Sequence, residues 1–411
     1  MMQNTIKKLF ASQLYTISLY SRQIAGTVVL LFITRFLLVS EYGLFRSYGT
    51  IATFCLMFAN LDYSNYILVS SKAKVQEVKL KISLFILFAI FILLFVLSVS
   101  LFIPLEDHII FGLVLIRTFF DVTFFTLILP YFQSTKKFNT ISIINIFYSI
   151  MTVVLAFLCY LMHYNLKNFL YLSIALGLFN FIQCTYYAKI NYFLLFKHIK
   201  KVLNKIDKSI FAYMGASITW FLYAQIPSLY VSTLIKKDDA AIFFAAFTIA
   251  NIVYVLVNAQ NQKLLPELIK SSYHDSVKII KNNILIIFSA LAVILFVFIL
   301  FGQNILQSIY GNEIYGSANI ILIILMMGNM FIALGAIYGA YITAKGYQKH
   351  KPKMMLEASI ITIISLLMFI KFGIYDAAIS FLLAGIYAGC RFTLFARKLL
   401  QEQNNKENYN E

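Results

Sequence analysis

The chain has 411 residues, of which 61% are hydrophobic, 17% aromatic and only 12% charged, with a mean hydropathy of +0.81. Soluble domains are about 45–50% apolar, so this composition excludes a soluble protein and indicates one embedded in a membrane. The net charge of +17 would suggest nucleic acid in a soluble protein, but here the basic residues cluster between apolar runs, where anionic lipid attracts them. We therefore expect membrane lipids as partners and no nucleic acid.

Apolar stretches long enough to cross a bilayer recur along the whole chain. A helix needs about 20 such residues to cross a hydrocarbon core of about 30 Å. In chain order they lie near 14–39, 43–67, 82–103, 108–133, 141–162, 169–196, 209–235, 240–262, 284–301, 316–344, 355–371 and 376–396. We predict twelve transmembrane helices. The first continues apolar past residue 30 without a small-residue cleavage site, so we expect a retained helix and not a removable signal peptide.

The loops between these stretches alternate in charge. One set holds most of the basic residues, including five lysines within 197–208, whereas the opposite set is mainly acidic, with Glu41, Glu106 and Glu313 among its residues. By the positive-inside rule we predict a multi-pass protein with both termini in the cytoplasm. No loop exceeds roughly 20 residues, so we expect the function to lie within the bilayer.

The stretch 108–133 contains the segment VLIRTFFDVTFF, which places Arg117 and Asp121 among apolar residues. Arg117 lies about 15 Å along a helix from Asp107, near the bilayer midplane. A charge that faces lipid there costs about 2.5 kcal/mol or more, so both side chains must face protein or water. Residues four apart share a helix face. Either they neutralise each other or pair with other helices as a structural lock, or Arg117 lines a polar cavity and binds a diphosphate while Asp121 holds it.

Four more charged residues lie within the predicted spans. Arg22 and Arg391 either line the same cavity or extend to the cytoplasmic interface. Arg35 either contacts substrate or bonds to the first turn, for example to Glu41, and Asp62 either joins the site or pairs with a neighbouring helix. With Arg117 and Asp121 included, this set has an excess of two positive charges, which favours an anionic cargo.

Motifs of the common catalytic sites are missing. The sequence contains no GxxxxGK[ST], HExxH, CxxC or GxSxG. The five histidines show no metal-ligand spacing, and the four cysteines lie in apolar runs, where they are expected as small buried hydrophobes. We therefore expect neither an enzyme nor a cofactor or metal site.

The two halves of the chain resemble each other. EYGLFRSYGTIATFCLMFAN (41–60) aligns with DAAIFFAAFTIANIVYVLVN (239–258) at a shift of 198 residues. The shift matches the first span with the seventh, and six spans per half give both halves the same orientation. We predict an all-α membrane fold of two six-helix bundles, related by a parallel repeat, with a central cavity. The predicted domains are 1–205 and 206–400, followed by a polar cytoplasmic tail, 401–411.

Five segments carry a family resemblance. They are ITRFLLVSEYGLF (33–45), NLDYSNYILVSSK (60–72), TIANIVYVLVNAQNQKLLPEL (248–268), SIYGNEIYGSANIILIIL (308–325) and AYITAKGYQKHKPKM (340–354). They are similar to the repeated signatures of the Wzx-type polysaccharide flippases, which handle O-antigen and capsule units. That family belongs to the multidrug/oligosaccharidyl-lipid/polysaccharide exporter superfamily. The similarity extends over nearly the whole chain.

The resemblance implies a flippase that moves undecaprenyl-diphosphate-linked oligosaccharide units by alternating access. It would carry them from the cytoplasmic to the periplasmic leaflet of the bacterial cytoplasmic (inner) membrane, with other polysaccharide assembly proteins as partners. A cation-coupled exporter of small molecules is one alternative, disfavoured by the positive set of buried charges. A membrane enzyme of glycan assembly is another, disfavoured by the missing catalytic groups. The candidate substrate-binding residues are Arg117, Asp121, Arg22, Arg35, Arg391 and Asp62.

Overall fold

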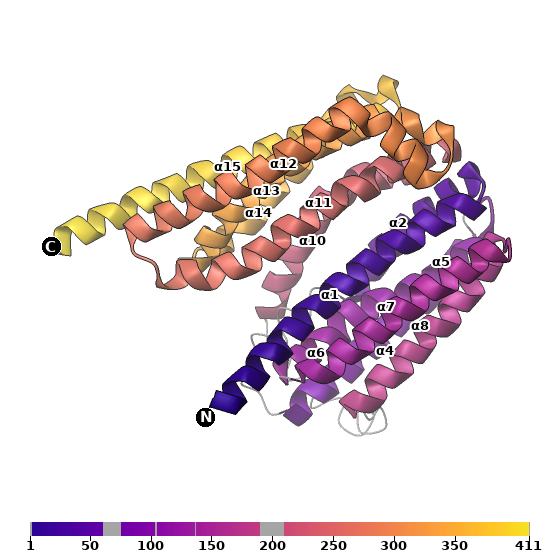
Figure 1. Cartoon of the computed structure of the whole chain (residues 1–411), viewed down its shortest axis with the longest axis horizontal. Helices are drawn as coiled ribbons and strands as arrows, with labels where there is room; N and C mark the ends of the chain where they lie inside the picture. Colours follow the sequence, from indigo (N-terminus) through magenta and orange to yellow (C-terminus); the bar gives the residue numbers. More distant parts are fainter. Residues whose placement is uncertain (1, 61–74, 103–104, 136, 190–208, 411) are drawn as a thin grey trace. The chain divides into compact units, whose positions relative to one another are not determined.

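A computed structural model of the chain describes residues 2–60, 75–102, 105–135, 137–189 and 209–410 (Figure 1). These residues form helices and connecting turns and contain no strand. The chain divides into two compact units, unit 1 (Met1–Ile218) and unit 2 (Thr219–Glu411). The predicted domain boundary at 205/206 lies outside the described residues and stays a prediction.

Unit 1 is a bundle of helices whose apolar faces pack on one another. Helix α1 lies along α7, and α5 lies between α2 and α8. The elements are α1 (Met2–Phe36), α2 (Val39–Asn60), α4 (Val75–Ser100), α5 (His108–Thr123), the π-helix η2 (Phe124–Ile128), α6 (Leu129–Ser134), α7 (Phe138–Leu161) and α8 (Leu166–Ala188).

Unit 2 is built around α13, which packs against α15, α11 and α12. Helix α10 crosses the division between the units. The elements are α10 (Ser209–Leu234), α11 (Lys237–Lys270), α12 (Tyr273–Tyr310), the 3₁₀ turn η3 (Glu313–Ser317), α13 (Ala318–Ala344), η4 (Gln348–His350), α14 (Lys351–Met368), η5 (Ile370–Phe372) and α15 (Ile374–Asn410).

Glycines allow α13 and α15 to approach closely. A Cβ built on Gly385 would lie 2.9 Å from the carbonyl oxygen of Gly328, and one on Gly389 would lie 2.6 Å from that of Phe331. Both distances are shorter than a carbon and a carbonyl oxygen can approach. Gly385 and Gly389 stand four residues apart on one face of α15, the spacing that lets helix backbones touch in membrane proteins. The central contact of unit 2 therefore depends on residues without side chains.

The predicted spans coincide with helices in the part of the chain that the structure describes, and the all-α membrane class is confirmed. Six of the described helices, α4, α7, α8, α12, α13 and α15, are by themselves long and apolar enough to cross a bilayer. Large apolar side chains such as Leu285, Val293 and Phe296 of α12 are exposed, as expected of a surface that faces lipid. The cavity predicted between the bundles stays a prediction.

The predicted span 108–133 is not one regular helix. Helix α5 passes into the π-helix η2, where the N–H of Leu129 donates to the carbonyl of Phe124 five residues back, and then into α6. Pro130 has no N–H, so the carbonyl four residues before it lacks its usual donor. Phe124 and Ile128 of η2 are buried in an apolar cluster with residues of α4 and α6. This cluster fixes the end of α5, the helix that carries both charges of the predicted site.

Candidate functional site

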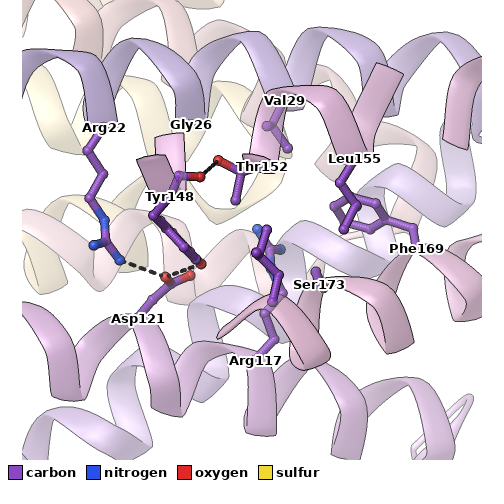
Figure 2. A pocket seen from close by; sticks show the side chains of 11 residues that line it. Arg22, Gly26, Val29, Arg117, Asp121, Tyr148, Thr152, Leu155, Phe169 and Ser173 are labelled. Atoms are coloured by element: carbon purple, nitrogen blue, oxygen red, sulfur yellow. Dashed lines mark hydrogen bonds and ion pairs between the residues drawn. The ribbon is translucent and has the colours of Figure 1, made fainter. Parts of the chain in front are cut away.

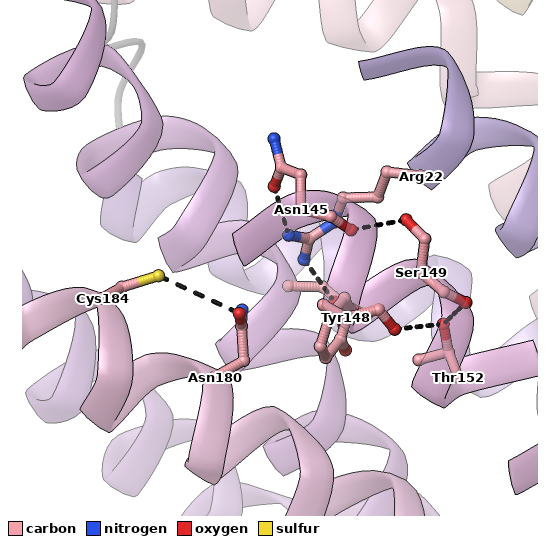
Figure 3. A network of polar contacts seen from close by, with 8 residues as sticks. Arg22, Asn145, Tyr148, Ser149, Thr152, Asn180 and Cys184 are labelled. Carbon is pink, nitrogen blue, oxygen red and sulfur yellow. Dashed lines mark hydrogen bonds and ion pairs between the residues drawn. The ribbon is translucent and has the colours of Figure 1, made fainter. Parts of the chain in front are cut away.

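Arg22 and Asp121 form an ion pair inside unit 1. Arg22 on α1 has only 8% of its surface exposed, and its Nη2 lies 3.3 Å from Oδ1 of Asp121 on α5. Its Nη1 donates to Oδ1 of Asn145 on α7 at 3.3 Å. The guanidinium carbon also stands 3.8 Å from the ring centroid of Phe124 and 4.4 Å from that of Tyr148. Arg22 is therefore held by side chains of α5, α7 and the π-helix (Figures 2 and 3).

Asp121 accepts from two elements at once. Besides Arg22, the hydroxyl of Tyr148 donates to its Oδ1 at 3.3 Å, and Figure 2 shows these contacts as dashed lines. The sequence left open whether Asp121 pairs with Arg117, one turn earlier on α5, or with other helices. An arginine four residues before an acid is the less favourable order for pairing along one helix. Asp121 instead bonds across the bundle to α1 and α7.

Arg117 stands apart from this ion pair. Among the described residues it forms neither an ion pair nor a hydrogen bond; its contacts are with aromatic rings. Its guanidinium carbon lies 5.2 Å from the ring centroid of Phe45 on α2 and 5.4 Å from that of Phe169 on α8. Its side chain lines the same cavity as Asp121. The cavity thus contains a cation with no neutralising carboxylate of its own.

The cavity has a volume of about 300 Å³. It lies within unit 1, between α1, α5, α7 and α8. Apolar side chains line part of it, and the charged side chains and the hydroxyl-bearing residues Tyr148, Thr152 and Ser173 line the rest (Figure 2). Two arginines and one aspartate leave one net positive charge. The lining residues are Arg22, Gly26, Val29, Arg117, Asp121, Tyr148, Thr152, Leu155, Phe169, Ser173 and Leu176.

Polar residues on α7 extend the site into the bundle. The hydroxyl of Ser149 donates to the carbonyl of Asn145 at 2.7 Å, and Thr152 donates to the carbonyls of Tyr148 and Ser149. On α8, the thiol of Cys184 lies 3.9 Å from Oδ1 of Asn180 (Figure 3). Asn145, Tyr148 and Thr152 are not among the residues predicted from the sequence. Their spacing of three to four residues on an otherwise apolar helix is the signal that could have found them.

The other candidates from the sequence lie elsewhere. Arg391 is in unit 2, where its Nε donates to Oε2 of Glu357 at 3.1 Å. Arg35 is exposed in the last turn of α1, and the carboxylate of Glu41 accepts from the backbone N–H of Leu38 at the start of α2. Asp62 lies outside the described residues. Glu357, absent from the predicted charge sum, neutralises Arg391.

Unit 2 also holds a buried acid, at the start of the predicted span 376–396. Asp376, in the first turn of α15, is 0% exposed. Its Oδ2 accepts from the hydroxyl of Tyr230 at 3.1 Å, while its Oδ1 has no hydrogen-bond partner in the described structure. No group of three or more potential metal ligands occurs in the residues that the structure describes.

The end of α5 opposite the π-helix is fixed by a cap and an ion pair. Asp107 precedes α5 and accepts from the N–H of Ile110 at 2.9 Å, and its Oδ2 lies 3.1 Å from Nζ of Lys167 at the start of α8. Partial burial tends to raise the pKa of Asp107, but the N–H of Ile110 and the Lys167 ammonium outweigh it and hold the pKa below its usual value. The cap and pair set the position of α5 against α8, and hence of Arg117 against Phe169.

Comparison with known proteins identifies one relative by sequence and several proteins of similar structure. No family model matches the chain. The capsular polysaccharide biosynthesis protein CapF of Staphylococcus aureus is 27% identical over 290 residues, which are 66% of this chain and 70% of CapF. The lipid II flippase MurJ in an inward closed conformation matches with a TM-score of 0.71 at 18% identity, over 94% of this chain and 87% of MurJ.

A MATE multidrug resistance transporter of the MOP superfamily in an outward-facing conformation has a TM-score of 0.61 at 13% identity, over 96% of this chain and 97% of the transporter. The resemblance drawn from the sequence is thereby confirmed: this chain has the fold that these membrane proteins share.

Proposed function

Because the chain has the fold of the multidrug/oligosaccharidyl-lipid/polysaccharide exporter superfamily, we propose that it is a flippase for undecaprenyl-diphosphate-linked oligosaccharide units. It moves them by alternating access from the cytoplasmic to the outer leaflet of a bacterial cytoplasmic membrane, with both of its own termini in the cytoplasm. The observation that carries the proposal is Arg117, an arginine without a carboxylate partner that lines a cavity of about 300 Å³. The likeness to a capsular polysaccharide protein supports the class of cargo.

The size and chemistry of the cavity suit a headgroup better than a whole repeat unit. Ligand pockets for drug-sized molecules run from about 300 to 1,000 Å³, so this cavity is at the small end of that range. A diphosphate fits such a space, whereas the polyprenyl chain stays in lipid and the sugars extend beyond the cavity. A guanidinium keeps its charge in a dry site and matches two phosphate oxygens with two parallel N–H donors.

The Arg22–Asp121 pair serves this cargo indirectly. Without Asp121, two cations would face the cavity, and a diphosphate would bind too tightly to be released. A transport site must bind its cargo strongly enough to admit it and weakly enough to let it leave. One uncompensated positive charge meets both needs.

Export of cationic small molecules is the second candidate, and the MATE likeness is the observation that favours it. A cationic cargo needs an acidic excess in its site. The described cavity has the opposite balance, with Arg22 and Arg117 against Asp121. We therefore rank this function below the flippase.

The test is a flipping assay with the purified full chain in proteoliposomes. The probe is undecaprenyl diphosphate linked to a short labelled glycan, and its appearance in the outer leaflet is measured with a glycosidase added outside. We expect flipping by the wild type, a loss in Arg117→Ala, and a large loss in Arg117→Lys because the lysine cannot bind two oxygens in parallel.

Arg397→Ala is the matched control, because it removes an exposed arginine that does not line the cavity. It should flip the probe at the wild-type rate. Normal flipping by Arg117→Ala at equal protein content would contradict the assignment of the site. Absence of flipping by the wild type, together with drug efflux in cells, would favour the second candidate.

A further inference from the structure

We propose that Phe45 and Phe169 are positioning residues that hold the Arg117 guanidinium in the cavity while leaving its N–H donors free for an anion. This inference rests on the proposed function and deepens it, because it names the groups that present the cation to the cargo. The two ring centroids lie 5.2 and 5.4 Å from the guanidinium carbon, within the range of about 6 Å at which an aromatic face attracts a cation.

The two arginines of the cavity are held in different ways. Arg22 donates to Asp121 and Asn145, so its donors are in use and its charge is compensated. Arg117 is held by rings alone among its described contacts. In Figure 2 the dashed contacts join Arg22 and Tyr148 to Asp121 and Thr152 to Tyr148, and none ends on Arg117. Arg22 therefore has a structural role, whereas the N–H donors of Arg117 remain available to bind an anion.

An aromatic ring suits this task better than a carboxylate. The ring attracts the guanidinium through its quadrupole and takes up no N–H donor. A carboxylate would occupy two of the five donors and cancel the charge. Only the first arrangement keeps the guanidinium in place and still leaves it able to bind two phosphate oxygens.

The rings themselves are fixed by packing. Phe45 is 4% exposed and Phe169 is 1% exposed, and their ring centroids stand 6.3 Å apart in an edge-to-face contact. Phe169 also contacts Phe36 of α1, at 6.2 Å between centroids. Three helices therefore set the place of the two rings. A long arginine side chain held in this way loses less freedom when the cargo arrives, which strengthens binding.

The experiment varies the electrostatics of the ring at nearly constant size. Phe169 of the full-length protein is replaced by phenylalanine analogues with increasing numbers of ring fluorines, which weaken the quadrupole. Binding of radiolabelled undecaprenyl diphosphate is then measured in nanodiscs. We expect the affinity to fall stepwise with fluorination, by roughly 3- to 30-fold in total, the range typical of a cation held by a ring. The same series at Phe36, a neighbouring ring with no described contact to Arg117, should leave the affinity unchanged.

A role in packing alone predicts a different result. Affinities that do not change along the Phe169 series, or that fall equally in the Phe36 series, would overturn the inference. If fluorinated Phe169 proteins fold poorly, the same series at Phe45 applies, and Phe169→Tyr should bind like the wild type.

The wild type and Arg117→Ala separate this inference from the proposed function. A wild type that does not bind the probe refutes both. A wild type that binds, with a loss in Arg117→Ala and no trend in either phenylalanine series, refutes only the role of the rings.

Discussion

Replacing Asp121 by alanine should destabilise unit 1, because it removes the carboxylate to which Arg22 donates. At 3.3 Å, the attraction between two unit charges is about 5 kcal/mol at an effective dielectric constant of about 20. The Asp121 side chain is 37% exposed, so solvent screens part of this energy, and the burial of Arg22 costs a further part. We expect a net loss of about 1–3 kcal/mol, which lowers the melting temperature of a unit of this size by about 2–12 °C.

The assay is a double-mutant cycle on thermal unfolding in detergent, followed by circular dichroism. If the pair is a structural lock, Arg22→Met combined with Asp121→Ala should be less destabilised than the sum of the single changes, by about 1–3 kcal/mol. Arg117→Ala combined with Asp121→Ala should be additive, because Asp121 bonds to Arg22 and not to Arg117. Additivity in the first pair, within about 0.5 kcal/mol, would refute the reasoning.

Three further outcomes are expected. Gly389→Leu should abolish accumulation of folded protein, because its Cβ would lie 2.6 Å from the backbone oxygen of Phe331; size-exclusion chromatography measures this. Lys167→Ala should make the stability of the fold depend less on pH in acid. The pKa of Asp107 is lowered in the folded state, so its carboxylate stabilises the fold above the unfolded pKa of about 4. This stabilisation is lost as the pH falls through the folded pKa. Melting curves from pH 6 to pH 3 measure it, with an effect below about 1 kcal/mol because the ion pair is partly exposed. Asp376→Asn should raise the melting temperature or leave it unchanged, because no described basic residue compensates this buried carboxyl.

Each of these three predictions can be contradicted by a specific result. Gly49→Ala tests whether any added methyl harms the fold, since nothing lies within 4 Å of a Cβ there; normal folding of Gly389→Leu would contradict the close contact. An unchanged acid profile in Lys167→Ala would remove the ion pair as a cause. A fall of several degrees in Asp376→Asn would mean that the hydrogen bond from Tyr230 stabilises the carboxylate by more than its burial costs.

The sequence predicted the helices from apolar stretches of about the length that a bilayer requires. It could not predict the π-helix Phe124–Ile128, since a widened turn depends on how residues far apart in the chain pack around it. The site was predicted in part. Arg117, Asp121 and Arg22 stand out as charges in apolar runs, and the structure brings all three to one cavity.

The partners of these charged residues could not be predicted from the sequence. Asp121 pairs with Arg22, 99 residues away in the chain, and no local spacing indicates such a contact. The rings of Phe45 and Phe169 are two among 40 phenylalanines, so only their position against Arg117 distinguishes them. Glu357 was missed because it lies at the edge of a predicted span, where an acid is unremarkable.

The π-helix between α5 and α6 has a consequence for changes in chain length. A widened turn of this kind holds one residue more than a regular turn, while the helical faces on either side stay aligned. Deleting one residue within 124–128 would therefore replace the widened turn by a regular one with Arg117 still directed at the cavity, and would alter mainly the ring that covers Arg22. Deleting one residue within 109–116 would instead turn one part of the helix by about 100° relative to the other. Single-residue deletions in homologous chains should accordingly gather at this one turn of the helix.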